Sequence, residues 1–398
     1  MSVGEMDPVV VGYARTPFGK LRGRLSQVSA VELGAVAIRG ALQRSGLVPE
    51  QVEQVLMGTV ITAGLGQVPA RQAALRAGIP STVPALSVNK VCASSLKAVN
   101  LGALLIRAGD AEVVVAGGME SMSGAPMLLR GARGGFAMGD QTLYDSMLWD
   151  GLTCPVDQVH MGEHGSQVAA ELGVDRRAQD EYALLSQQRY EQARAAGRIA
   201  EELVPVEVSQ KTAREQVEQD EQPRPDTTLE KLQSLRPVFG GPDGSVTAGN
   251  APGINDGAAA VVLVSRRRAR ELGLTVLATW LAYGESAADH PYLATVPALA
   301  LEQALGRHGG LTAQELRLLE INEAFASVVL TSSRMLEVEL DRVNVNGGAI
   351  AIGHPIGASG ARILGSLVLE LGRRGGGVGA ATICSGLAQG EATLVEVA

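Results

Sequence analysis

Residues 85–118 read ALSVNKVCASSLKAVNLGALLIRAGDAEVVVAGG, and this stretch decides the fold class. The apolar run 85–88 precedes a turn with a cysteine, and 94–107 follows with helical spacing of its apolar residues. The helix is expected to stop at Gly109, before the buried strand 112–116 and its two following glycines. Strand, helix and strand in this order predict an α/β fold with a parallel or mixed sheet.

A similar pattern recurs near the C-terminus. Residues 344–346 predict a strand, Ser359 opens a helix, and 379–383 predict a second strand. In both segments, 22 positions separate the first helical serine from an alanine of the following strand. The recurrence is consistent with an internal duplication, although unrelated α/β units share such spacing.

Further predicted strands and helices continue the alternation of strand and helix, except in the region from about 120 to 248. We expect strands at 9–11, 54–57 and 257–264, and helices at 30–45 and 176–196. Between about 120 and 248 the alternation is lost, and Lys211–Arg236 is charged and proline-rich, which predicts extended loops. This region reads as an insertion on the scaffold, where binding residues are often found.

The composition limits the classes of function. The 398 residues carry 34 Lys and Arg against 42 Asp and Glu, a net charge of −8, and only 3% are aromatic. Such a chain does not suit nucleic acid or an anionic membrane as a partner. Three cysteines form no disulfide framework, and no run reaches the ~20 apolar residues that span a bilayer. We therefore expect a cytoplasmic protein.

Two cysteines and one asparagine stand at predicted turns. Cys92 lies between a strand and a helix, where the helix dipole and free N–H groups would favour the nucleophilic thiolate. Cys384 follows the buried strand 379–383. By position alone, each cysteine could equally be a small core residue. Asn322 is expected at a strand-to-helix turn, where asparagine is also a common cap.

His354 stands in a glycine-rich segment, GGAIAIGHPIGASG at 347–360, after what reads as a β-rich run. Glycines allow tight turns and the close approach of a ligand. A hydrogen-bonded core histidine remains an alternative. A dinucleotide-binding loop also competes, because 357–360 opens a helix, but the acidic residue that such a site needs after a later strand is missing.

Residues 160–164 read HMGEH and match the H-x-x-E-H pattern of inverted zinc proteases. That pattern needs a helix with both histidines on one face and a further ligand. Gly162 and Gly165 should weaken such a helix. We therefore expect a substrate-loop or solvated histidine here rather than a zinc ligand at His160 or His164, and no metal requirement for activity.

Taken together, six segments resemble the signatures of the thiolase family in the right order: 14–19, 89–98, 246–259, 322–326, 346–362 and 383–390. The resemblance covers nearly the whole chain. It implies a five-layered α/β/α/β/α core of two similar halves, formed by 1–119 with 249–272 and by 273–398. It also implies an inserted loop domain at 120–248 that binds coenzyme A.

The resemblance further implies roles in a ping-pong acyl transfer. Cys92 would accept the acyl group, His354 would activate it as a base, and Cys384 would move the α-proton of the second acyl-CoA. Asn322, through a bound water beside His354, would form one oxyanion hole. The backbone N–H groups of Cys92 and Gly386 would form the other. A Claisen condensation needs both a covalent acyl carrier and fixed oxyanion donors.

Acyl-CoA thioesters are the implied substrates, with no permanently bound cofactor, and a dimer or tetramer is the expected assembly. The candidate coenzyme A contacts are His160, Met161, Arg224, Ala248 and Phe325. A cationic stretch could serve the phosphates: Lys211, Arg214, Arg224, Lys231 and Arg236. Apart from Arg224, each of these cations could equally be a solvated surface charge.

Three residues depart from the family pattern. Pro252 replaces a usual serine, Leu293 a usual methionine that walls the acetyl pocket, and Leu387 a usual glycine. The implied activity is the reversible conversion of two acetyl-CoA into acetoacetyl-CoA and CoA. The alternative is a degradative 3-ketoacyl-CoA thiolase of broader chain length. An acyl-CoA-binding protein without catalysis, a zinc hydrolase and a ketoacyl synthase fit these residues less well.

Overall fold

The computed structural model describes residues 4–209 and 214–398. One main sheet passes through both halves of the chain in the order β12-β13-β14-β11-β1-β10-β5-β3-β4. Its strands are β1 (Pro8–Arg15), β3 (Gln54–Gly58), β4 (Ala85–Val88), β5 (Val113–Ser121), β10 (Asn255–Ser265), β11 (Ala278–Ala287), β12 (Leu318–Ile321), β13 (Gly377–Ser385) and β14 (Gln389–Val397). The short β2 (Gly19–Lys20) also pairs with β10. Parallel pairs at β3–β4, β3–β5 and β12–β13 among antiparallel neighbours make this a mixed sheet.

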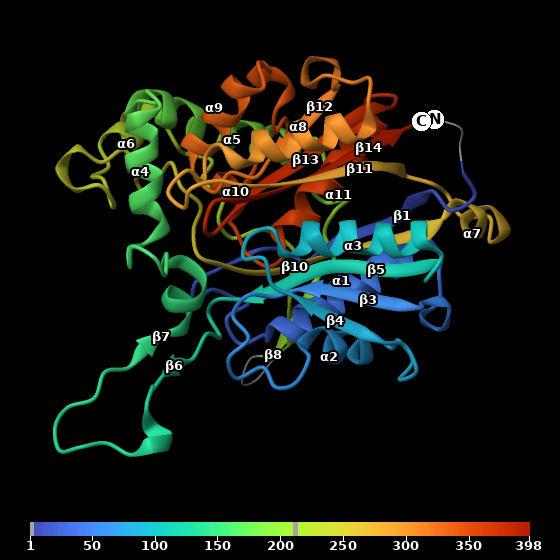
Figure 1. The fold of residues 1–398 in the computed structure, drawn as a ribbon, viewed down its shortest axis with the longest axis horizontal. Coiled ribbons are helices and arrows are strands. Elements are labelled where there is room, and N and C mark those ends of the chain that lie inside the picture. Colours follow the sequence, from blue (N-terminus) through green and yellow to red (C-terminus); the bar gives the residue numbers. More distant parts are fainter. Residues whose placement is uncertain (1–3, 210–213) are drawn as a thin grey trace.

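Helices lie on both sides of the sheet and between its two halves (Figure 1). Helices α1 (Ala30–Ser45) and α2 (Pro69–Arg76) cover the N-terminal strands. Helices α3 (Ser94–Ala108) and α11 (Ser359–Arg373) pack together between the N-terminal and C-terminal strands. Helix α8 (Val296–His308) covers the C-terminal strands, with α9 (Ala326–Met335) beside it. The five-layered α/β/α/β/α core expected from the sequence is confirmed.

The central helix α3 is unusually apolar. Together with the turn before it, α3 forms an 18-residue stretch, 91–108, with a mean hydropathy of 1.3. Within the described ranges, it is the one helical stretch long and apolar enough to cross a membrane. Here the helix is covered by strands and by α11. A helix that is apolar on most sides is expected in such an enclosed position. We therefore interpret it as a core helix.

The second copy of the strand–turn–helix–strand unit departs from the prediction. No strand forms at 344–346, and only an isolated bridge joins Leu319 to Val343, the residue just before this segment. The Asn344 side chain takes the place of a strand neighbour, because it accepts from the Ile321 N–H and donates to the Ile321 carbonyl, both at 2.8 Å. The expected β-rich run before His354 is likewise wrong, since α10 (Ala349–Ile352) occupies it.

The inserted region lies between β5 and β10 and contains more regular structure than predicted. Its helices are α4 (Met161–Glu171), α5 (Arg176–Ala195) and α6 (Leu229–Gln233), and its strands include β8 (Val206–Ser209) and β9 (Arg214–Val217). Helix α5 confirms the helix expected at 176–196. The extended loops expected over 211–236 are wrong in part, because β9 pairs with β8 and buries Val217 while α6 buries Leu232. Residues 218–228 and 234–236 form no helix or strand, as expected. Lys211 lies outside the described residues.

Candidate active site

Cys92 stands in a strained turn between β4 and α3. Val91, just before it, has a φ of 45°, an uncommon value for a β-branched residue. The turn is held by hydrogen bonds from the Val91 N–H to Asn89 Oδ1 at 3.0 Å and from the Lys90 N–H to Ser94 Oγ at 2.9 Å. Backbone strain that is held in place in this way is typical of functional sites.

Cys384 lies within β13, one residue before its end, and not after the strand as expected from the sequence; this end of the strand contacts the Cys92 turn. The Ser385 hydroxyl donates to the Lys90 carbonyl, which joins the two cysteine turns. After Gly386, Leu387 and Ala388 both have positive φ values, of 58° and 46°. This backbone explains why the family pattern usually has glycine at position 387, because glycine adopts positive φ without steric cost.

His354 is buried, and its ring is oriented by a serine that sequence reasoning did not assign. Its Nδ1 lies 2.6 Å from Ser359 Oγ, and that hydroxyl donates to the Pro355 carbonyl at 3.0 Å. The serine therefore accepts from Nδ1–H, which leaves Nε2 unprotonated and available as a base. Asn322, also buried, places Nδ2 3.5 Å from Nε2.

The loop that carries His354 packs directly on β5. A Cβ atom on Gly118 would lie 1.9 Å from the Gly357 carbonyl oxygen, so only glycine allows this approach. The buried carboxylate of Glu120 accepts from the Gly357 N–H at 3.0 Å and from the N–H groups of Val60 and Ile61 at 3.1 Å. Burial nevertheless raises the pKa of Glu120 to about 7. Sequence reasoning missed this residue, although it lies two positions after Gly118 in β5.

The turns of both halves meet at one pocket of about 270 Å³. Eight of the residues proposed from the sequence line it: Cys92, His160, Met161, Ala248, Phe325, His354, Cys384 and Gly386. Asn322 lies behind His354 rather than in the wall. Pro252 and Leu293, which depart from the family pattern, are also part of the wall. The predicted catalytic residues are therefore brought together from distant parts of the chain.

Several apolar wall residues were not expected, among them Met122, Leu152, Phe239, Ile254 and Ile356. Leu152 and Phe239 come from the inserted region, and Ile254 and Ile356 stand inside the quoted signature segments. Their position inside those segments was the available signal for Ile254 and Ile356. An apolar wall excludes water and strengthens electrostatic interactions within the pocket.

Arg224 does not line this pocket. It is exposed, and its backbone N–H donates to Gln187 Oε1 at 2.9 Å. Arg214 pairs with Glu207 at 3.0 Å, and Lys231 pairs with Asp226 at 2.7 Å. The phosphate contacts proposed for these cations stay predictions.

The two thiols differ from the sequence-based expectation in their acidity. Burial raises the pKa of Cys92 to about 12, and the charge of Glu120 acts in the same direction. Burial also raises the pKa of Cys384, with a further contribution from Cys92. The expected preference of Cys92 for the thiolate is therefore wrong for the free site, since desolvation outweighs the backbone N–H groups. Both cysteines rest as neutral thiols and need a base.

The H-x-x-E-H segment also folds differently from the expectation. Despite Gly162 and Gly165 it forms the start of α4, with His160 as its N-cap and the His160 Nδ1 accepting from the Gly162 N–H at 3.0 Å. The His160 ring stacks on Phe239 with 4.3 Å between centroids. A Cβ on Gly162 would lie 2.1 Å from that phenyl ring, so the glycine serves packing. His164 contacts Asp157 instead, and the two histidines do not form the protease pattern.

The neutrality of His354 leads to a pH prediction. Burial, and secondly the charge of Arg362, lowers the pKa of His354 from 6.5 to about 3. A base must be unprotonated, so His354 stays competent as the pH falls through 6.5 and is lost only near 3. If Cys92 accepts an acetyl group from acetyl-CoA, as the resemblance implies, we expect the rate of its acetylation, followed by rapid quench from about pH 5 to pH 8, not to fall as the pH passes through the ordinary imidazole pKa. A loss of rate with a midpoint near 6.5 would contradict this protonation state.

Comparisons with known proteins agree with the geometry. The family model for the thiolase N-terminal domain matches residues 8–267, and the model for the thiolase C-terminal domain matches residues 274–397. An acetyl-CoA acetyltransferase of Cupriavidus necator is 51% identical over 98% of this chain and 99% of its own length. One from Pseudomonas aeruginosa is 48% identical over 97% of this chain and 98% of its own.

Solved structures give the same picture. Human mitochondrial 3-ketoacyl-CoA thiolase matches with a TM-score of 0.94 and 39% identity, covering 99% of this chain and 100% of its own. The acetyl-CoA acetyltransferase of Bacillus anthracis matches with a TM-score of 0.95 and 37% identity, covering 98% of this chain and 99% of its own. Both similarities extend over essentially the whole fold.

Proposed function

Because the chain belongs to the thiolase family, we propose that it is an acetyl-CoA C-acetyltransferase, which interconverts two acetyl-CoA with acetoacetyl-CoA and CoA. The observation that carries the proposal is the convergence of Cys92, His354 and Cys384 on one largely apolar pocket. Two thiols and one neutral imidazole supply an acyl carrier and the proton transfers of a Claisen condensation. The curated relatives named above carry the same activity in their names.

In the first half-reaction, His354 Nε2 takes the Cys92 thiol proton as the sulfur attacks the carbonyl carbon of acetyl-CoA. The carbon–sulfur bond to CoA breaks, and the imidazolium returns the proton to the leaving CoA sulfur. The developing oxyanion is held by fixed N–H donors, for which the backbone groups of Cys92 and Gly386 are the candidates. Free CoA and acetyl-Cys92 result.

In the second half-reaction, Cys384 passes its thiol proton to His354 and removes a methyl proton from a second acetyl-CoA. The resulting carbanion attacks the acetyl carbonyl on Cys92, and the new carbon–carbon bond forms as the Cys92 sulfur leaves. The imidazolium of His354 then protonates that sulfur. Asn322, close to His354 Nε2, belongs beside the oxyanion of this second substrate.

The size of the pocket supports a short acyl group. Its volume of about 270 Å³ lies just below the ~300–1,000 Å³ of typical ligand sites, and it must also take the end of the pantetheine arm. We expect kcat/KM for CoA-dependent thiolysis to be highest with acetoacetyl-CoA and to fall by about tenfold or more with 3-ketodecanoyl-CoA. A flat or rising profile would favour the alternative, a 3-ketoacyl-CoA thiolase of broad range. The Leu293→Ala variant enlarges the pocket and should reduce the difference in kcat/KM between the two substrates. The Leu293→Met variant should retain that difference, because methionine has about the same volume as leucine.

We further propose a cytoplasmic homo-oligomer. An arm of the inserted region, which carries β6 (Met127–Leu128) and β7 (Tyr144–Asp145), projects from the body of the molecule (Figure 1). It exposes large apolar side chains, including Met127, Phe136 and Met138. An apolar surface of this kind favours contact with another copy of the chain.

A further inference from the structure

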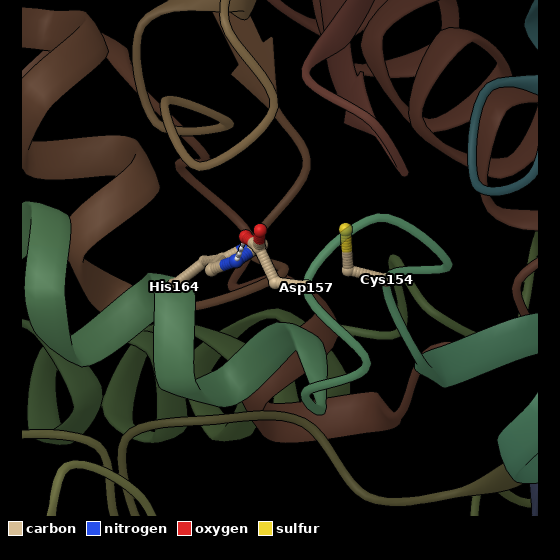
Figure 2. Close-up of side chains that lie close together, drawn as sticks. All are labelled: Cys154, Asp157 and His164. Carbon is tan, nitrogen blue, oxygen red and sulfur yellow. Dashed lines mark hydrogen bonds and ion pairs between the residues drawn. The ribbon is translucent and has the colours of Figure 1, made fainter.

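A group of metal-ligating residue types lies outside the catalytic residues. Cys154, Asp157 and His164 converge between the start of α4 and the loop before it (Figure 2). Each offers a ligand atom, and these atoms all lie within 4.8 Å of one another. His164 Nε2 is 2.8 Å from Asp157 Oδ2. Neither Cys154 nor Asp157 lines the catalytic pocket, so the acyl-transfer scheme does not account for the group.

The loop that carries two of these residues is closed on itself. The Cys154 N–H donates to the Val159 carbonyl at 2.8 Å, and the Gln158 N–H donates to the Cys154 carbonyl at 2.9 Å. The Gln158 side chain donates to the Pro155 carbonyl at 2.6 Å. Cys154 and Asp157 are therefore held at a C-x-x-D spacing, similar to the C-x-x-C spacing of many zinc sites. A site held in this way needs little ordering when an ion binds.

The imidazole of His164 is under-satisfied. The residue is 2% exposed and Cys154 is 1% exposed. Within 4–209 and 214–398, His164 Nδ1 is buried without a hydrogen-bond partner, and only Nε2 meets a polar group. An unmet polar atom in the interior costs about 1–3 kcal/mol. The ring is thus only half satisfied: Nε2 faces Asp157, and Nδ1 has no polar partner among the described residues.

A second histidine holds the carboxylate from the other half of the chain. His290 Nε2, in the connection between β11 and α8, also lies 2.8 Å from Asp157 Oδ2. Oδ2 thus faces two imidazoles, which leaves Oδ1 for a ligand. The carboxylate is partly exposed, and a cavity of about 640 Å³ opens beside Asp157 and His164. That cavity gives an ion a path from solvent.

We propose that Cys154, Asp157 and His164 bind one zinc ion, with His290 orienting the Asp157 carboxylate. Sulfur, nitrogen and oxygen donors together suit borderline-soft Zn²⁺ better than Mg²⁺ or Ca²⁺. Ligand atoms of a tetrahedral zinc ion lie about 3.3–3.8 Å apart. The ligand atoms of Cys154, Asp157 and His164 lie within 4.8 Å of one another, so shifts of about 1 Å would bring them to these distances. On binding, the Cys154 thiol proton leaves to solvent. The proposal therefore departs from the expectation that His164 binds no zinc, whereas activity is still expected not to require a metal.

The position of the site points to a role in fixing the pocket wall rather than in the chemistry. Thr153 pairs with His160 next to the closed loop, and the His160 ring lines the catalytic pocket. An ion at Cys154, Asp157 and His164 would hold this loop on α4. No step of the acyl transfer passes through it, so the ion contributes to stability and to the position of His160.

The test is cobalt and zinc binding by the purified full-length protein. We expect about one ion per chain and, with Co²⁺, a sulfur-to-metal charge-transfer band. The variants Cys154→Ser and His164→Gln should lose the band and bind at least about 100-fold more weakly, and His290→Gln about 10–100-fold more weakly. The matched controls Cys92→Ser and His308→Gln should bind as the wild type does. Equal affinity in Cys154→Ser and wild type, or no stoichiometric binding by the wild type, would overturn the proposal.

Thermal unfolding shows whether the effect of a substitution on stability comes from lost zinc binding or from a general defect in folding. A strong chelator should lower the Tm of the wild type, and added zinc should restore it in proportion to the logarithm of its concentration. The Tm of Cys154→Ser should not respond to either treatment. Thiolysis by the chelated wild type should continue below its Tm. A zinc-independent Tm in the wild type, or thiolysis that stops at once on chelation of a folded enzyme, would contradict this role.

Discussion

Cys92→Ser and Cys92→Ala should both abolish turnover and leave the fold intact. Cys92 lies in a turn that is held by the backbone and by Asn89 and Ser94, not by its own thiol. Neither a hydroxyl nor a methyl group replaces sulfur as the acyl carrier, so the loss should approach the ~10⁶-fold seen when a nucleophile is removed elsewhere. Thiolysis kinetics measure the effect, and circular dichroism with thermal unfolding checks the fold.

Mass spectrometry locates the adduct independently of the rate. After mixing with acetyl-CoA, the peptide that contains Cys92 should gain one acetyl group. Cys154 is the comparison thiol, because it is buried and lies outside the catalytic pocket, whereas Cys92 is partly exposed within it. Acetylation of Cys154, together with retained turnover in Cys92→Ser, would show that the nucleophile is wrongly assigned.

Cys384→Ala and His354→Ala should fail at different steps. Cys384→Ala should still take up an acetyl group from acetyl-CoA, because that half-reaction needs only Cys92, His354 and an oxyanion site. It should not condense, because no group remains to remove the α-proton, and exchange of the acetyl methyl protons with solvent should fall by about 10²–10⁴-fold or more. His354→Ala should lose acetyl uptake itself, since the neutral Cys92 thiol, with its pKa of about 12, then has no base.

The different effects of these two substitutions follow from the two-step scheme. Because acetyl uptake and condensation occur one after the other, a variant that blocks only the second can be distinguished from one that blocks the first. Rapid-quench acetylation measures the first step, and deuterium exchange of the acetyl methyl group measures the second. Ser359→Ala is a milder control, because it removes the partner of His354 Nδ1 and the hydrogen bond to the Pro355 carbonyl but leaves the imidazole in place. Equal loss of acetyl uptake in Cys384→Ala and His354→Ala would place Cys384 among the groups that activate the nucleophile.

The sequence by itself determined the fold class and the chemistry-bearing residues. Helix α1 was predictable because its apolar spacing and the glycine stop at Gly46 are local, and β10 because a continuous apolar run marks a buried strand. The signature segments around Cys92, His354 and Cys384 were sufficient to indicate the family. Local signals failed where a side chain replaced a backbone partner, as Asn344 does beside Ile321, and where packing against Phe239 favoured a helix despite Gly162.

Only the tertiary structure decided how these residues behave. The acidity of Cys92 depends on how completely its surroundings exclude water, and burial reverses the effect expected from the helix terminus alone. The tautomer of His354 depends on a serine hydroxyl that is itself engaged by the Pro355 carbonyl. The contact of Asp157 with both His164 and His290 joins residues more than a hundred positions apart. Desolvation and long-range contacts are properties of the folded chain as a whole, so no local pattern in the sequence could specify them.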